Sequence, residues 1–253
     1  MPAAIFIRLA LVEARRGGLV WFAALCLAGG VALGAFLAQL AISESRLLQA
    51  SIVAALLRLA AVFIIAAHAV SSVRREIDER RLELLLALAL PRATQYLGRL
   101  AGFVVLGIVL AACFSLPLAL WAPVPGIFAW GTSLACELAL VAAAALFFAM
   151  TLSALVPALG ATAALYMLAR SIGTIQAIAD GPLADDSLAQ RLASGTVNAI
   201  AFVLPALDLA TRSEWLLYGA PQAQVLGAAL VGCLIYAALL AAAGLFDFQR
   251  RAL

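Results

Sequence analysis

Long uninterrupted apolar runs alternate with short polar stretches along this chain of 253 residues. The runs are rich in Ala and Leu and reach the ~20 residues with which a helix crosses the ~30 Å hydrocarbon layer of a bilayer. Strands of a membrane barrel would be about 10 residues long and would alternate polar with apolar positions. The pattern therefore predicts an all-α integral membrane protein with six transmembrane helices. We place these spans at residues 18–42, 49–73, 100–121, 128–152, 159–178 and 223–246.

Composition supports a membrane protein, because 66% of the residues are hydrophobic and only 11% are charged. A water-soluble core of this size could not bury that much apolar surface. No polar stretch is long enough to fold as a separate domain. We therefore expect one membrane domain over residues 1–253, with an interfacial segment at 1–17, a cytoplasmic loop at 74–94 and an external segment at 179–222.

Arginines near short loops orient the spans, because they stay on the cytoplasmic side during insertion. With the N-terminus inside, only Arg46, Arg191 and Arg212 fall outside. The arginines that fall inside are Arg8, Arg15, Arg16, Arg74, Arg75, Arg80, Arg81, Arg92, Arg99, Arg250 and Arg251. Six crossings return the C-terminus to the same side. We expect a multi-pass protein of a bacterial cytoplasmic (inner) membrane with both termini in the cytoplasm.

The first apolar run is predicted to be an anchor, since its length exceeds the 7–15 residues of a signal-peptide core. Before it, Ile5, Leu9 and Val12 fall along one side of a helix, and the arginines at positions 8, 15 and 16 are available to anionic headgroups. These positions predict an interfacial helix on the inner leaflet.

The chain contains no lysine, because all sixteen of its Lys and Arg residues are arginine. A P-loop needs a lysine that reaches the outer phosphates of the nucleotide, and Schiff-base catalysis also needs a lysine. The single histidine, His68, excludes H-E-x-x-H and other multi-histidine metal sites. Four cysteines lie in predicted spans, where they act as small apolar residues: Cys26, Cys113, Cys136 and Cys233. We expect no disulfide, metal, cofactor or ATPase site in this chain.

The tetrapeptide LASG at 192–195 resembles the serine region of intramembrane rhomboid proteases, with His68 as a conceivable base. Ser194 falls in the external segment, however, whereas His68 falls near the cytoplasmic end of the second span. A nucleophile needs its base within hydrogen-bond reach, and Ser and Gly are common in helix caps and membrane helices. We therefore expect no catalytic residue.

A charged stretch at residues 73–99, which we call the charged island, separates the second and third spans and holds six arginines and four acids. Three pairs of opposite charge stand four residues apart, and they are Arg74 with Asp78, Arg75 with Glu79, and Glu76 with Arg80. Such pairs stabilise a helix in water. The run at 82–90 is apolar but too short to span a bilayer, and Pro91 ends it. Periodicity alone equally allows a solvated loop helix that keeps two spans in register.

The order of residues in the island resembles the cytoplasmic loop of ABC-2-type transporter permeases, which reads roughly R-E-x-E-x-x-x-L-E-x-L-L-x-x-P-x-x-R. The residues that carry this resemblance are Arg75, Glu76, Glu79, Leu82, Glu83, Leu85, Leu86, Pro91 and Arg92, followed by Tyr96 and Gly98. Six spans and cytoplasmic termini extend the resemblance loosely over the whole chain. Arg80 and Arg81 depart from the pattern, because the family often has glycine or threonine there.

The resemblance implies the membrane subunit of an ABC transporter, which moves a substrate, in the direction of export, with ATP hydrolysed by a separate subunit. In such permeases the loop is a coupling helix that docks into a nucleotide-binding subunit. The implied docking residues are Arg74, Arg75, Glu76, Glu79, Arg80, Arg81, Leu82, Glu83, Leu85 and Leu86. ATP and Mg would be bound by the partner. The implied partners are ABC ATPase subunits, a second identical or similar permease chain and membrane lipid, without nucleic acid.

Two other functions stay open from the sequence. One is a haem-exporter-type permease of cytochrome c maturation, and the other is an intramembrane enzyme or scaffold that does not transport. A neighbouring gene for a protein with Walker A and signature motifs would favour transport.

Three charged residues and the single histidine stand inside predicted spans, and they are Arg58, Glu137, Arg170 and His68. An unpaired charge in the membrane costs at least about 3 kcal/mol, so we expect partners. Arg58 and Glu137 lie at similar depth, which predicts an ion pair between the second and fourth spans, with Arg170 as a competitor. The pair fixes helix packing or lines a path for an anionic substrate. We expect His68 to make a hydrogen bond between helices.

The external segment contains a mostly apolar stretch at 196–207 that ends near Pro205. Its length suits a re-entrant or interfacial helix. Asp208 and Arg212 follow at a helical spacing, with Trp215 and Tyr218 suited to headgroup depth. Residues 196–218 are a candidate external gate.

Overall fold

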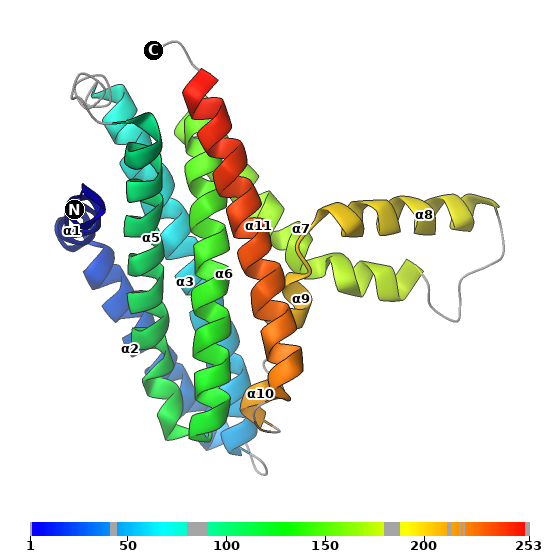
Figure 1. Cartoon of the computed structure of the whole chain (residues 1–253). Helices are drawn as coiled ribbons and strands as arrows, with labels where there is room; N and C mark the ends of the chain where they lie inside the picture. Colours follow the sequence, from blue (N-terminus) through cyan, green and yellow to red (C-terminus); the bar gives the residue numbers. More distant parts are fainter. Residues whose placement is uncertain are drawn as a thin grey trace.

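The computed structural model describes residues 2–40, 45–79, 91–179, 188–211, 214–217, 219 and 221–250. Every regular element in these ranges is helical. The elements are α1 (Pro2–Arg16), α2 (Leu19–Leu40), α3 (Ser45–Asp78), α5 (Arg92–Ser115), the 3-10 helix η1 (Pro117–Leu120), α6 (Val124–Thr151), α7 (Leu155–Ala179), α8 (Leu188–Val203), α9 (Leu207–Ala210), α10 (Glu214–Leu217) and α11 (Ala223–Arg250). Figure 1 shows most of them as one elongated bundle.

Six segments of the described chain are long and apolar enough to cross a membrane. They are Leu19–Gln39, Gln49–Asp78, Arg92–Leu120, Val124–Thr151, Leu155–Ala179 and Ala223–Arg250. The number and order of the predicted spans are thus confirmed, and the chain is a helical multi-pass membrane protein. Two helices continue well past the predicted ends, because α3 runs on through charged residues to Asp78 and α5 already begins at Arg92. The second span has 30 residues, which makes it about 45 Å long and longer than the hydrocarbon layer is thick.

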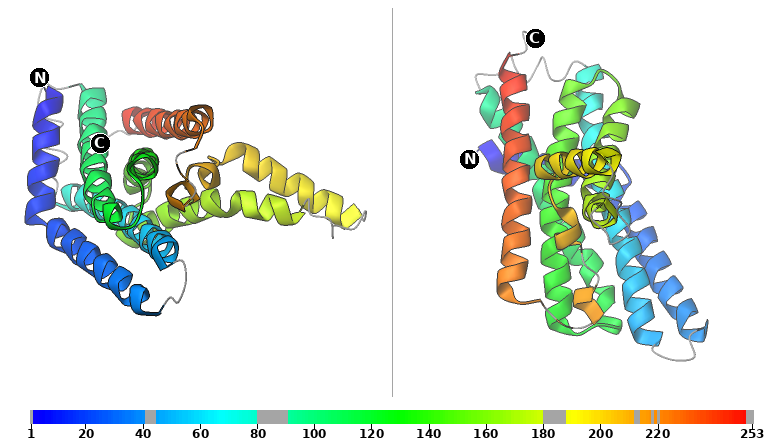
Figure 2. Two further views of the ribbon diagram at one scale, coloured as in Figure 1. Left: turned by 90° about the horizontal axis from the view of Figure 1, so that it is seen from below. Right: turned by 90° about the vertical axis from the view of Figure 1, so that its right-hand side faces the viewer.

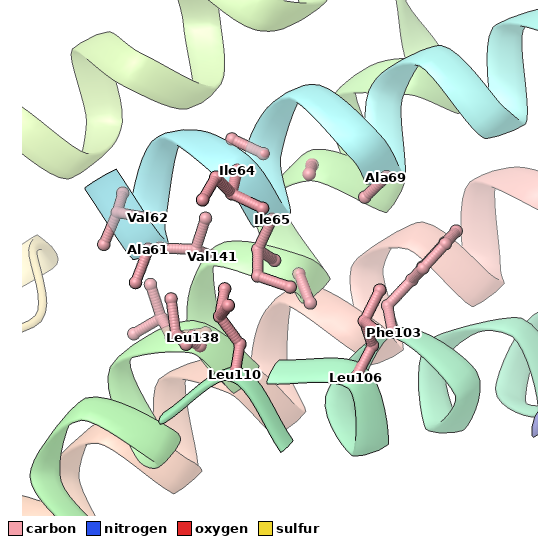
Figure 3. Packing of buried hydrophobic residues seen from close by; sticks show 14 of the residues in the cluster. Ala61, Val62, Ile64, Ile65, Ala69, Phe103, Leu106, Leu110, Leu138 and Val141 are labelled. Carbon is pink, nitrogen blue, oxygen red and sulfur yellow. The ribbon is translucent and has the colours of Figure 1, made fainter. Parts of the chain in front are cut away.

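Helix α6 lies at the centre of the bundle, with α3, α5 and α11 packed around it (Figure 1). In the most apolar stretch of α6, 72% of the residues are buried, whereas in that of α11 only 11% are buried. Four consecutive alanines in α6, Ala142 to Ala145, are at most 1% exposed. Such small side chains let neighbouring helices approach closely. Figure 3 shows the resulting core, where Ile65 of α3, Leu106 of α5 and Leu138 of α6 converge.

Helix α1 lies across α5, outside the main bundle (Figure 2). Phe6 and Ala10 are buried against α5. Two glycines of α5 permit this approach, because a Cβ atom at Gly98 would collide with the Phe6 ring and one at Gly102 would lie 2.8 Å from Cβ of Ala10. The face predicted to meet lipid is exposed, with Ile5 at 68%, Leu9 at 51% and Val12 at 49%.

Helix α8 and the adjoining part of α7 form an antiparallel hairpin, which we call the arm. Figure 1 shows the arm leaving the bundle between its two ends, and the view from below in Figure 2 shows it on the side away from α1. Within the arm, Nε2 of Gln176 donates to Oδ1 of Asn198 at 2.9 Å. At its base, the Tyr236 hydroxyl of α11 donates to the carbonyl of Val203 at 2.6 Å. The helix expected from residue 196 begins earlier, at Leu188, and ends before Pro205.

Candidate functional site

A buried polar network crosses the middle of the bundle. Nη1 of Arg58 on α3 lies 2.6 Å from Oε2 of Glu137 on α6, and neither side chain has exposed surface. This contact confirms the ion pair predicted between the second and fourth spans. Nη2 of Arg58 donates to Oγ of Ser133 at 3.0 Å, and the guanidinium lies 5.0 Å from the centre of the Trp130 ring. The cation is therefore neutralised, hydrogen-bonded and stacked on an aromatic face.

Helix α7 joins the network through Tyr166, which sequence reasoning missed. The Tyr166 hydroxyl donates to Oε1 of Glu137 at 2.8 Å and accepts from Nη1 of Arg170 at 2.7 Å. Arg170 also lies 3.8 Å from that carboxylate oxygen, so the expected second cation does reach Glu137. Its distance of four residues from Tyr166 is the one sequence signal that connects the two side chains.

The geometry separates two roles within the network. The side chains of Arg58 and Glu137 have no exposed surface and connect α3 to α6. The Arg170 side chain, in contrast, is 31% exposed. Both charges of the pair are neutralised and hydrogen-bonded inside the protein, so the pair joins the two helices. Arg170 is thus the member of the charged triad best placed to meet a ligand or a solvent-filled space.

An open apolar groove of about 720 Å³ runs between α2, α3 and α7, next to the network. Small-molecule sites typically measure about 300–1,000 Å³. The polar lining residues are Thr162 and Tyr166. Both hydroxyls already have acceptors within the protein, since Oγ1 of Thr162 donates to the carbonyl of Ala158 at 2.8 Å and the Tyr166 hydroxyl donates to Glu137. The groove therefore suits an apolar occupant.

His68 makes an aromatic contact. Its ring meets the Phe103 ring of α5 edge to face, with 6.0 Å between the ring centres. Its buried Nε2 has no hydrogen-bond partner among the described residues, so the expected hydrogen bond between helices was wrong for this atom. Oγ of Ser194 donates to the carbonyl of Ala179 at 3.3 Å. The two residues considered for a protease site thus have separate local partners.

The charged island begins as a direct continuation of a spanning helix, because α3 runs without a break from Ser45 to Asp78. Arg75 and Glu79 are exposed at its end. On the far side of the island, Pro91 is the N-cap of α5. Six of the ten expected docking residues lie outside the described residues, and these are Arg80, Arg81, Leu82, Glu83, Leu85 and Leu86.

Arg74 points into its own chain. Its Nη1 donates to the carbonyl of Leu152, the C-cap of α6, at 3.2 Å, and its Nη2 donates to the carbonyl of Ser153. Nη2 also lies 3.2 Å from Oδ1 of Asp78, which confirms that predicted pair. The Arg74 side chain is 11% exposed, so little of it is available to a partner.

Two further contacts hold the same turns of α3. Glu76 forms an ion pair with Arg99 of α5, and these side chains are 17% and 8% exposed. Oγ of Ser72 donates to Oε2 of Glu13 on α1 at 2.8 Å. These turns of α3 are thus attached to α1, to α5 and to the connection between α6 and α7.

The described residues contain no cluster of three or more His, Cys, Asp or Glu side chains that could hold a metal ion. All four cysteines are free thiols. No protein-family model and no curated protein matches the chain. Function is therefore inferred from the residues and their geometry.

Proposed function

We propose that this chain is the permease subunit of an ABC transporter of the ABC-2 type, which exports a substrate with ATP hydrolysed by a separate nucleotide-binding subunit. The observation that carries the proposal is the charged island, which resembles the coupling loop of that family and continues from spanning helix α3. The absence of lysine is consistent with a separate ATPase subunit, because these 253 residues cannot supply the lysine of a P-loop.

The docking surface combines charge with apolar anchors. Arg75 and Glu79 lie exposed where α3 ends, and Leu82, Leu85 and Leu86 follow as the apolar half. Charges steer a partner, while apolar side chains in its pocket supply affinity. A helix that continues from the membrane transmits displacement better than a flexible loop. Arg74 is excluded from this surface by its internal contacts.

The island marks the cytoplasmic side of an inner membrane, and both termini lie there. Helix α1 lies in the inner interface, with Ile5, Leu9 and Val12 toward lipid and its arginines toward headgroups. Like α1, the arm runs across the long axis of the bundle and parallel to the membrane plane, but it lies on the opposite side of the bundle (Figure 1). In the candidate gate at 196–218, helix α10 (Glu214–Leu217) lies beside Gly126 at the external start of α6, and this part closes the pathway there.

Transport takes place between two permease chains, and an apolar or amphipathic substrate suits it best. The groove beside Tyr166 supports this class, because its lining is almost wholly apolar. Arg170 places one partly exposed cation next to it. The buried pair of Arg58 and Glu137 keeps α3 and α6 together during the movement.

Affinity purification of the tagged chain from its native membrane tests the proposal. We expect a subunit with a Walker A motif to copurify and the complex to hydrolyse ATP. Replacing Leu82, Leu85 and Leu86 with Asp should abolish copurification without preventing membrane insertion. An inserted triple variant that retains the ATPase subunit contradicts the docking assignment.

A further inference from the structure

Ser72, Arg74 and Glu76, near the end of α3, make contacts on two opposite sides of that helix. Successive helical residues are turned by about 100°, so Ser72 and Glu76 share one side of α3 and Arg74 faces the other side. The first two bind Glu13 of α1 and Arg99 of α5. Arg74 alone reaches the connection between α6 and α7.

The chemistry of the Arg74 contact suits a stiff link. The carbonyls at a helix C-terminus lack partners within the helix and carry partial negative charge. A planar guanidinium donates from two nitrogens in a fixed fork, and here Nη1 and Nη2 meet the consecutive carbonyls of Leu152 and Ser153. Asp78 holds the same guanidinium from the α3 side, with 3.2 Å between Oδ1 and Nη2.

The link leads to the helix that borders the candidate substrate site. Helix α7 starts at Leu155, two residues after Ser153. It carries Tyr166 and Arg170 into the buried network, lines the apolar groove and continues into the arm (Figure 1). A displacement of the end of α3 therefore has a direct route to the groove wall through one side chain.

We propose that Arg74 is the positioning residue that transmits movement of the charged island to α7. This inference rests on the proposed function, because a nucleotide-binding partner supplies the movement. When the partner displaces the island, Arg74 carries the α6–α7 connection with it, and the tilt of α7 relative to α5 changes. The ties at Ser72 and Glu76 hold α1 and α5 and are not part of this route.

The test measures whether α7 moves with nucleotide. Spin labels are placed on two exposed residues, as Val156→Cys in α7 and Ile108→Cys in α5, in a background without the four native cysteines. The complex with its ATPase subunit is studied in nanodiscs, diluted with unlabelled permease so that each distance is measured within one chain. Distances are compared without nucleotide and with ATP plus vanadate.

We expect nucleotide to shift the distance in the parent protein and the shift to be lost in Arg74→Ala. The Arg74→Lys variant keeps the charge but not the fork, so its shift should be at least halved. Ser72→Ala, which removes the tie to α1 on the other side of α3, is the matched control and should keep the full shift. The Lys and Ser72 variants distinguish a broken link from a general loss of folding.

Three results overturn the inference in different ways. If the complex forms and hydrolyses ATP but Arg74→Ala keeps the full shift, the role of Arg74 is wrong while the proposed function stands. If no ATPase subunit copurifies with the parent, the proposed function fails and the inference fails with it. A parent complex without any nucleotide-dependent shift also refutes the role of Arg74.

Discussion

Nη1 of Arg58 lies 2.6 Å from Oε2 of Glu137, at a place where neither side chain has exposed surface. The two residues are 79 positions apart in the sequence, so the pair fixes how α3 packs on α6. Removing one partner from a buried ion pair leaves an uncompensated charge, which costs about 3–5 kcal/mol.

Reversing either charge alone, as Arg58→Glu or Glu137→Arg, should destabilise the protein by about 3–5 kcal/mol. The double reversal should recover part of the loss, because opposite charges face each other again. Recovery stays incomplete, since an arginine at 137 would meet Arg170, now 3.8 Å from the carboxylate. Unfolding in detergent measures the coupling energy by a double-mutant cycle. Strict additivity of the two single effects would argue that the residues do not pair.

Tyr166→Phe should cost about 1–3 kcal/mol, because Glu137 and Arg170 both lose a hydrogen bond in a buried setting. The neighbouring residue Met167 is 52% exposed, so Met167→Leu is a control that should change stability little. Thermal unfolding of the purified protein measures both. Equal midpoints for the two variants would contradict a structural role for the hydroxyl.

Gly102→Leu should displace α1 from α5, because even a Cβ atom there lies 2.8 Å from Ala10. Overpacking of this kind costs about 1–3 kcal/mol. Gly160→Leu is the matched control, since a Cβ atom at Gly160 has nothing within 4 Å. Trypsin cleavage at the arginines of α1 reports its release and should become several-fold faster in the first variant alone. The same cleavage rate in both variants would count against the packing described.

Cysteines at the two ends of the bundle should label from opposite sides of the membrane. Val124→Cys, at a site 76% exposed, should react in intact cells with a reagent that does not cross membranes. Glu79→Cys, in the charged island, should react only after permeabilisation, because the positive-inside rule places the island in the cytoplasm. The reverse pattern would refute the orientation.

The apolar runs predicted the number and order of the spans because run length depends only on bilayer thickness. The Arg58–Glu137 pair was predictable because two opposite charges at similar depth in lipid have few other ways to be neutralised. The ends of the helices were less predictable from apolar runs. Helices α3 and α5 continue into charged sequence, which a helix tolerates in water but which ends an apolar run.

Other contacts depend on tertiary packing that no local pattern encodes. From the sequence, Arg74 is expected to be a surface charge that pairs with Asp78. Its other acceptors are the backbone carbonyls of Leu152 and Ser153, which no sequence pattern predicts. Tyr166 is uncharged, and its one sequence signal is the spacing of four residues from Arg170. The arm was missed because the apolar content of 196–207 suggested a separate short helix, whereas α8 begins at Leu188 and packs along α7.

The proposed docking surface uses only some of the apolar residues at 82–90. If residues 82–90 continue a helix, Leu82, Leu85 and Leu86 lie on one face, while Leu84, Ala87 and Leu88 lie on the other face. Converting the second set to Asp therefore adds the same charge to the face that should not dock. This variant is the matched control for the triple replacement of the first set, and it should keep the ATPase subunit.

Photo-crosslinking shows whether an ATPase subunit docks on the charged island. A benzoylphenylalanine at Leu85 should crosslink the chain to an ATPase subunit in native membranes, with loss of the crosslink when Leu82 and Leu86 are changed to Asp. The same probe at Trp21, which is 81% exposed on α2, should give no such product. An ATPase crosslink at Leu85 alone is the result we predict. Its absence at Leu85, or equal crosslinking at Trp21, would contradict the docking of a nucleotide-binding subunit on the charged island.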